Sequence, residues 1–238
     1  MSGLAVQPIS TGEAVVASLR ARILDGVIAP GARLPEAELA ADFGVARPTV
    51  REAIQTLCHE GLLVRERNRS AHIPVLTNEE ILDLFSVRIP LECLIVRAVL
   101  ERKAPLAPAR EAMAVMEALP NDAGWSKVVS ADAAFHQALV SAVGSPRLER
   151  LYGALSGEIR LCVAQLRPSW ASPAAIGHEH HEVIDVLESG DVEAAAGIKR
   201  LVDNSPRPLD VDGLEAILDA AWHGDPGRLS SDEVKVSA

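Results

Sequence analysis

The first third of the chain shows apolar residues at helical spacing, interrupted by glycine and proline. Ser10 and Glu13 have the spacing of a capping box, and apolar side chains follow at every fourth position. This pattern predicts a helix from about Ser10 to Gly26. Two further stretches, 36–43 and 47–60, show the same spacing, and we expect both to be helices.

Two short apolar runs follow the third predicted helix. The runs at 62–64 and 72–75 are expected to form strands, with the polar segment between them as the tip of a β-hairpin. Asn68 lies in this tip and tolerates a positive φ. Residues 8–76 are therefore predicted to form a winged helix-turn-helix, in which the hairpin is the wing.

In this architecture the third helix lies in the major groove of DNA. Arg47, Thr49 and Arg51 are predicted to point away from the apolar stripe of that helix. Arginine binds guanine edges or phosphates through paired hydrogen bonds. A solvated basic face without a partner is the other interpretation, and the order of the elements favours DNA. The predicted DNA contacts are Arg33, Arg47, Thr49, Arg51, Arg67, Asn68 and Arg69.

The rest of the chain shows helical spacing and no segment with the spacing of a strand. A capping box at Thr77 and Glu80 opens a long helix, which Pro90 is predicted to kink. About six helices are expected, so the second domain is predicted to be an all-α bundle. They are expected at about 77–103, 109–119, 126–143, 146–166, 173–189 and 191–202.

Charge separates the same two parts of the chain. Acidic and basic residues balance within residues 1–75, so the whole net charge of −10 falls on residues 76–238. This difference indicates two domains with different partners. The boundaries are predicted as 8–76 for the winged helix and 77–204 for the helical domain. Residues 205–238 are expected to be a C-terminal extension that is partly disordered.

Composition narrows the class of protein. The apolar fraction of 48% excludes wholesale disorder, and only 3% aromatic residues favours helices over sheets. No apolar run is long enough to cross a membrane, and no secretory signal is visible. Three widely spaced cysteines argue against a disulfide framework and indicate a reducing cytoplasm. We therefore expect a cytoplasmic protein without a membrane partner.

Three polar side chains are predicted to face the interior of the bundle. Asp132 and His136 are four residues apart on one predicted helix, and His180 shares a helical face with Ile184. Carboxylate and imidazole ligands suit Zn, Ni or Mn, although a hydrogen-bonded Asp–His pair is the alternative. The run His178–His181 lacks the spacing of a metalloprotease motif.

The first domain resembles the GntR-type winged helix. The resemblance implies a bacterial transcription factor whose DNA contacts come from Arg47, Thr49, Arg51 and the wing tip. It is carried by Leu19-Arg20-x-x-Ile23-x-x-Gly26, Pro30-Gly31-x-x-Leu34, Glu38-Leu39-Ala40, Gly44-Val45-Ala46-Arg47-Pro48-Thr49-Val50-Arg51-Glu52-Ala53-Ile54, Leu57 and Glu60-Gly61-Leu62.

The chain departs from the family pattern at several positions near the predicted DNA contacts. Ala46 stands where the family usually has serine or threonine, so a helix cap worth about 1 kcal/mol is missing. Ala37 stands where fatty-acid-responsive relatives often have arginine. Asn68 and Ser70 replace wing glycines. These changes bear on the operator sequence and not on the binding mode.

The second domain resembles the FCD ligand-binding domain of FadR-type GntR regulators over about residues 80–204. The matching motifs are Arg88-x-x-x-Glu92, Asp132-x-x-Phe135-His136, Glu179-His180 and Gly190-Asp191. The resemblance implies three metal ligands, Asp132, His136 and His180. The fourth ligand position falls at Val202, which cannot bind a metal, and Asp203 is poorly placed to replace it. His178 or His181 could substitute, and a site that has lost its metal is the other interpretation.

Together these resemblances imply a homodimeric transcription regulator, interpreted as a repressor of a palindromic operator. The effector is expected to be a small organic acid, with Arg88 as the candidate to bind its carboxylate. Pairing of Arg88 with Glu92 on the helix surface is the alternative. A metal-dependent enzyme with the winged helix as a DNA tether is a second interpretation, although no nucleophile–base pair accompanies Asp132. A ligand-independent architectural DNA-binding dimer is a third.

Overall fold

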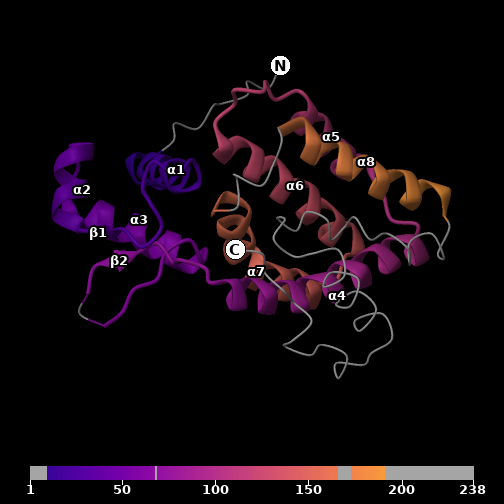
Figure 1. Ribbon diagram of the computed structural model, residues 1–238, viewed down its shortest axis with the longest axis horizontal. Helices are drawn as coiled ribbons and strands as arrows, with labels where there is room; N and C mark the ends of the chain where they lie inside the picture. Colours follow the sequence, from indigo (N-terminus) through magenta and orange to yellow (C-terminus); the bar gives the residue numbers. More distant parts are fainter. Residues whose placement is uncertain (1–9, 68, 166–172, 191–238) are drawn as a thin grey trace, which may run out of the picture. The chain divides into compact units, whose positions relative to one another are not determined.

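The computed structural model describes residues 10–67, 69–165 and 173–190 of the chain, without the side chains of 78 and 173–179. The chain divides into two compact units, residues 1–75 and 76–238 (Figure 1). The described part of the first unit contains three helices and two short strands, and that of the second is helical. No helix in these ranges is long and apolar enough to span a membrane.

The first unit is built on three helices, whose predicted positions are confirmed. They are α1 (Thr11–Leu24), α2 (Glu36–Phe43) and α3 (Arg47–His59). The capping box at the start of α1 is formed, because the Ser10 hydroxyl accepts from the amide of Glu13 and the Glu13 carboxylate accepts from the amide of Ser10. Gly44, at φ 63°, ends α2 in the left-handed conformation that glycine allows. The core of this unit includes Leu19, Val50, Ile54, Leu57 and Leu62.

The wing differs from the predicted two-stranded hairpin. Strand β1 (Arg33–Leu34), which the sequence did not predict, pairs antiparallel with β2 (Ala71–His72). The expected hairpin partner, Val64, is joined to His72 only by an isolated bridge. The segment between α1 and α2 therefore supplies an edge of the wing sheet, and this attaches the wing to the helices.

The second unit contains five helices among the described residues: α4 (Asn78–Arg102), α5 (Ala107–Glu117), α6 (Trp125–Val143), α7 (Pro146–Gln165) and α8 (Pro173–Ser189). Helix α6 packs against the other four. The predicted helix at 191–202 and the extension at 205–238 lie outside the described residues.

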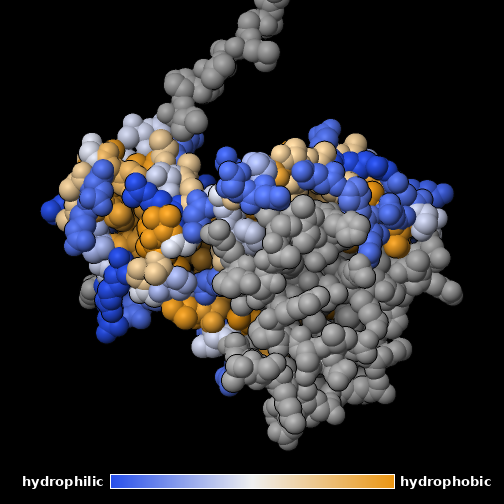
Figure 2. Space-filling view, turned by 45° about the horizontal axis from the view of Figure 1, so that its top comes forward, coloured by the Kyte–Doolittle hydropathy of each residue, from blue (hydrophilic) through white to orange (hydrophobic). Residues whose placement is uncertain are grey.

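Helix α4 begins at a capping box, in which Thr77 and Glu80 exchange hydrogen bonds as predicted. The helix continues through Pro90 and ends at Arg102. Its inner face is buried, but Val87 and Leu94, seven residues apart, are 50% and 53% exposed. Hydrophobic residues likewise reach the surface between hydrophilic ones on the face shown in Figure 2.

Candidate functional site

The start of α3 presents the predicted basic side chains to solvent. Arg47 and Arg51 are exposed and Thr49 is half-buried, whereas Val50 and Ile54 are completely buried beneath them. The helix begins without a side-chain cap at Ala46, as the sequence predicted. The amphipathic pattern therefore turns the two guanidinium groups outward, where they can bind a phosphate or a base edge.

One carboxylate holds two of the arginines in this region. Arg51 donates from Nε and Nη2 to Oε2 of Glu36, at 3.0 and 2.9 Å, and Arg65 donates from Nη2 to Oε1 of the same carboxylate. The hydrogen bond from Arg51 is the main reason that the pKa of Glu36 lies below its usual range. The pairing of Arg51 and Arg65 with Glu36 was not predicted, because no local pattern links residues so far apart.

The other predicted DNA contacts also lie in the first unit. Arg33, Arg67 and Arg69 are exposed, and Arg69 forms an ion pair with Glu66 at 2.5 Å. Asn68 lies outside the described residues. The exposed arginines therefore occur both on α3 and on the wing, which is the distribution that contact with a duplex requires.

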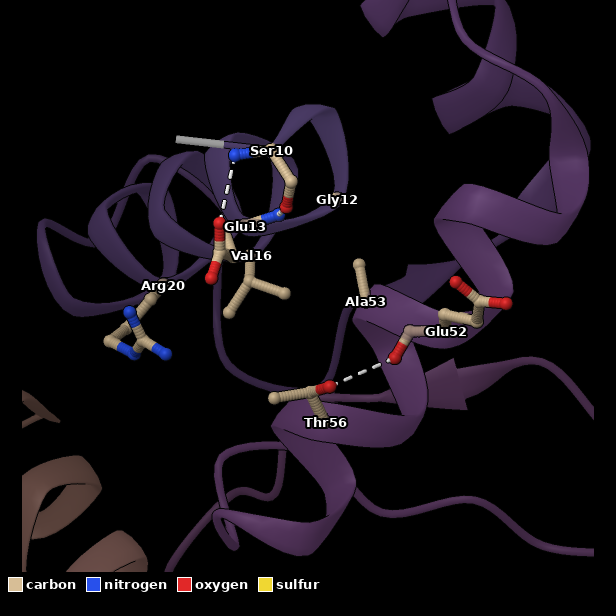
Figure 3. Close-up of a pocket in the computed structure, with 8 residues that line it drawn as sticks. All are labelled: Ser10, Gly12, Glu13, Val16, Arg20, Glu52, Ala53 and Thr56. Carbon is tan, nitrogen blue, oxygen red and sulfur yellow. Dashed lines mark hydrogen bonds between the residues drawn. The ribbon is translucent and has the colours of Figure 1, made fainter. Parts of the chain in front are cut away.

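A groove between α1 and α3 is too acidic to bind DNA phosphates (Figure 3). Its lining includes the carboxylates of Glu13 and Glu52 and one guanidinium, Arg20. That guanidinium is engaged by both oxygens of Glu60, at 2.9 and 2.6 Å. We therefore place no phosphate contact in this groove.

In the second unit, α6 and α8 bring together the three predicted metal ligands. Asp132, His136 and His180 are all buried, and their ligand atoms lie within 4.8 Å of one another. The Oδ1 atom of Asp132 lies 3.2 Å from Nε2 of His180 and 3.8 Å from Nε2 of His136. The ring of Phe135 packs edge-on against both imidazoles. The helical spacing of apolar residues thus pointed to three side chains that lie close together in the structure.

A buried ion pair adjoins this cluster. Arg88 donates from Nε to Oε1 of Glu92 at 2.8 Å, and the hydroxyl of Tyr152 donates to the same oxygen at 3.2 Å. The predicted alternative of a surface Arg88–Glu92 pair is wrong in its location, because both side chains are almost completely buried. Tyr152 was not predicted as part of this site, because it lies 60 residues from Glu92 and no local pattern links the two.

The contacts of His136 orient its ring. The Oε1 atom of Glu92 lies 3.3 Å from Nδ1, and Arg88 Nη2 lies 3.4 Å from Nε2. A carboxylate beside Nδ1 favours the proton on that nitrogen and leaves the lone pair on Nε2. This is the nitrogen that lies nearer to Asp132, so Glu92 directs a ligand atom of His136 into the cluster.

The protonation states also suit a metal. Burial lowers the pKa of His136, which keeps the imidazole neutral. Burial would raise the pKa of Asp132, but the hydrogen bond from His180 and the neighbouring positive charges hold it well below its usual range. The two carboxylates of Asp132 and Glu92 also outnumber the single guanidinium of Arg88 in this cluster. A neutral imidazole and an ionised carboxylate are the forms that bind a divalent cation.

The remaining candidate ligands do not complete the set among the described side chains. His181 contacts Glu117 on α5, and its side chain is 43% exposed, so it does not take the place of the fourth ligand. His178, Val202 and Asp203 have no described side chain. The three residues fit a divalent metal by donor type and charge.

A narrow enclosed cavity lies beside the ion pair. Its lining combines polar and apolar side chains, and it is too tight to admit a water molecule. Entry of an organic acid therefore requires these side chains to move. The lining residues are Glu92, Ile95, Val96, His136, Leu139 and Tyr152.

Comparison with protein families matches both units. Residues 11–73 match the bacterial regulatory proteins of the gntR family, and residues 83–203 match the FCD domain. A solved structure of a transcriptional regulator GntR from Rhodococcus sp. RHA1 is 30% identical, with 91% of this chain and 97% of that chain covered and a TM-score of 0.66. This chain belongs to the FCD-containing, FadR-like subfamily of GntR regulators.

Curated relatives of this GntR regulator are also transcription regulators. The HTH-type transcriptional regulator YdhC of Bacillus subtilis is 26% identical over 185 residues, which are 74% of this chain and 80% of the relative. The galactonate operon transcriptional repressor of Escherichia coli is 28% identical over 205 residues, with 76% and 88% covered. The chain is a DNA-binding transcription regulator with an effector-binding FCD domain, and the alternative of an enzyme finds no support.

Proposed function

We propose that this GntR regulator is a repressor that binds a palindromic operator as a homodimer and releases it when an organic acid binds to the FCD domain. The observation that carries the proposal is the winged helix with Arg47 and Arg51 exposed at the start of α3. The acid must bind the two states of the dimer with different affinity, because otherwise the equilibrium between them does not change.

The DNA contacts are assigned to α3 and the wing, and alanine variants test them. An operator duplex is first selected from a random pool with the wild-type chain. Arg47→Ala and Arg51→Ala are each expected to weaken its binding by roughly 1–3 kcal/mol, if the side chain contacts a base. Arg110→Ala removes a charge from α5 in the FCD domain and should leave binding unchanged. Unchanged affinity in both α3 variants would reject this assignment.

The metal is assigned to Asp132, His136 and His180, which would hold a zinc, nickel or manganese ion. When bound, the ion supplies a Lewis-acidic point that can take a carboxylate oxygen. Elemental analysis of the purified protein should find about one ion per chain, and His136→Ala should lose it. His59→Ala is the control, because this histidine is exposed on α3. Equal metal content in wild type and His136→Ala would remove the site.

The effector is proposed to be a small organic acid whose carboxylate binds Arg88. The relative named for the galactonate operon supports a sugar acid. The Nη1 atom of Arg88 is buried without a hydrogen-bond partner among the described residues, so it can donate a hydrogen bond to a bound anion. A panel of acids that includes galactonate tests this by thermal unfolding, because a ligand at 100 times its Kd stabilises by roughly 2.7 kcal/mol. Arg88→Lys should weaken that shift. A panel without any shift would favour the architectural DNA-binding dimer.

The homodimer is proposed to use the exposed apolar face of α4. Val87 and Leu94 lie on the same side of this helix, and a palindromic operator requires a two-fold symmetric protein. Val87→Glu combined with Leu94→Glu should give monomers in light scattering. Val115→Glu, at an exposed valine of α5, should leave the dimer intact. A double variant that remains dimeric would move the interface elsewhere.

The proposed domain boundaries are 8–76, 77–204 and 205–238. The first two boundaries are supported by the division of the chain into two compact units after Val75 and by the family matches at 11–73 and 83–203. Limited proteolysis should release fragments that end near these boundaries. A cytoplasmic location is proposed because a bacterial regulator must reach DNA inside the cell, and cell fractionation tests it.

A further inference from the structure

Glu36 is the first residue of α2, and its carboxylate ties together three elements of the winged helix. Its Oε2 atom accepts two hydrogen bonds from Arg51 on α3, and its Oε1 atom accepts one from Arg65 on the wing. Arg65 follows Val64, which bridges to β2. The recognition helix and the wing are therefore fixed to α2 through one side chain.

A carboxylate in this position works against nonspecific attraction to DNA. Every positive charge that neutralises a phosphate adds to the affinity for any duplex, whatever its sequence. Glu36 offsets one of the two arginine charges that it contacts. Its presence therefore reduces the general attraction to DNA. Its hydrogen bonds fix the direction of the arginine side chains instead.

Orientation matters because Arg51 is otherwise free to move. Its side chain is 56% exposed, and a long exposed side chain must lose rotational freedom when it binds. Two hydrogen bonds to one oxygen hold the guanidinium by its Nε–Nη2 edge and leave Nη1 for a partner. A group fixed before binding discriminates better between the correct base and others.

We propose that Glu36 is a positioning residue for DNA recognition. It orients Arg51 and Arg65, and so increases the preference for the operator over other DNA while it decreases the affinity for DNA in general. The inference rests on the proposed contact between Arg51 and DNA.

The test compares Glu36→Gln with Glu38→Gln in the full chain. Both residues lie in the first turn of α2 and both variants lose one negative charge. Glu38 is exposed and forms no ion pair within the described part of the chain, so it is a matched control. Fluorescence anisotropy would measure binding to the selected operator and to poly(dI-dC) at the same salt concentration.

Glu38→Gln should strengthen binding to both duplexes by a similar factor, so the ratio of the two affinities stays constant. Glu36→Gln should strengthen binding to poly(dI-dC). It should lower the ratio of operator affinity to poly(dI-dC) affinity at least fivefold. Glu36→Asp keeps the charge and shortens the side chain, so it too should lower the ratio. In the Arg51→Ala background, Glu36→Gln should have a much smaller effect on the ratio.

Three outcomes would overturn the inference. The first is a ratio for Glu36→Gln within twofold of that for Glu38→Gln. The second is a wild-type ratio for Glu36→Asp, which would reduce the role of Glu36 to its charge. The third is an undiminished effect in the Arg51→Ala background, which would indicate a general structural role. If Arg51→Ala alone left operator binding unchanged, the proposed DNA contact would fail as well, so the two failures are distinguishable.

Discussion

The guanidinium of Arg88 and the carboxylate of Glu92 form an ion pair across one turn of α4, with 2.8 Å between Nε and Oε1 and both side chains buried. Burial opposes the charge of Arg88, but the neighbouring charges, Glu92 first among them, raise its pKa above the ordinary value. Each charge of the pair therefore depends on the other to remain in the interior.

Removal of one partner should destabilise the FCD domain strongly. Glu92→Ala leaves a buried guanidinium without its carboxylate, and such a loss costs about 3–5 kcal/mol. The double variant Arg88→Met, Glu92→Leu removes both charges and should lie much closer to wild type. Urea unfolding followed by circular dichroism measures both. Glu79→Ala, at an exposed position in the first turn of α4, is the control and should change stability little. If Glu92→Ala were as stable as the double variant, the charge of Arg88 would not depend on Glu92 to remain in the interior.

A capping side chain at the start of α3 should increase the stability of the protein. Ala46 is the N-cap of α3, has extended backbone angles of φ −70° and ψ 145°, and makes no side-chain hydrogen bond to the helix. Ala46→Ser supplies a hydroxyl at this position and should stabilise the protein by about 1 kcal/mol. The midpoint of thermal or urea unfolding measures the change. Ala46→Val, which adds no side-chain acceptor, should gain no stability. A gain equal to that of Ala46→Ser would show that no cap is formed.

Elements with a local signal could be predicted from the sequence. Capping boxes and apolar spacing located the starts of α1 and α4 within one residue, and the helical period predicted that His180 faces inward. Strand β1 was missed because two residues are too few to show an alternation. The short sheet follows from contacts between segments far apart in the chain.

Relationships across the fold could not be predicted in the same way. Glu36 and Arg51 are 15 residues apart, and Glu92 and Tyr152 are 60 residues apart. Nothing near either residue of a pair indicates its partner, because packing between helices decides which side chains meet. The sequence therefore named the ligand set Asp132, His136 and His180 but not the carboxylate that orients His136.

That carboxylate should matter for metal affinity. Glu92 lies against Nδ1 of His136 and favours the tautomer with its lone pair on Nε2. Glu92→Gln should weaken zinc binding by about 10–100-fold, the range seen when such a partner of a metal-binding histidine is lost. Competition with a chromophoric chelator measures the affinity, and circular dichroism confirms that the variant is folded. Glu117→Gln, at the surface contact of His181, should bind zinc as wild type does. Equal affinity in both variants would show that Glu92 does not act on the site.

The free energy of unfolding should fall in alkaline solution because the thiol of Cys162 is buried. Burial raises its pKa to about 12, against a smaller opposite effect of Arg88. Between pH 9 and that value the unfolded chain releases a proton that the folded chain keeps, so stability is complete below pH 9 and falls as the pH rises. Cys162→Val cannot ionise, so its unfolding free energy should decrease less than that of wild type between pH 8 and pH 10.5. Iodoacetamide at pH 8 should label Cys162 only as the protein unfolds, since the buried thiol is both protonated and inaccessible. Rapid labelling of native protein, or identical pH profiles for the two chains, would contradict the assignment.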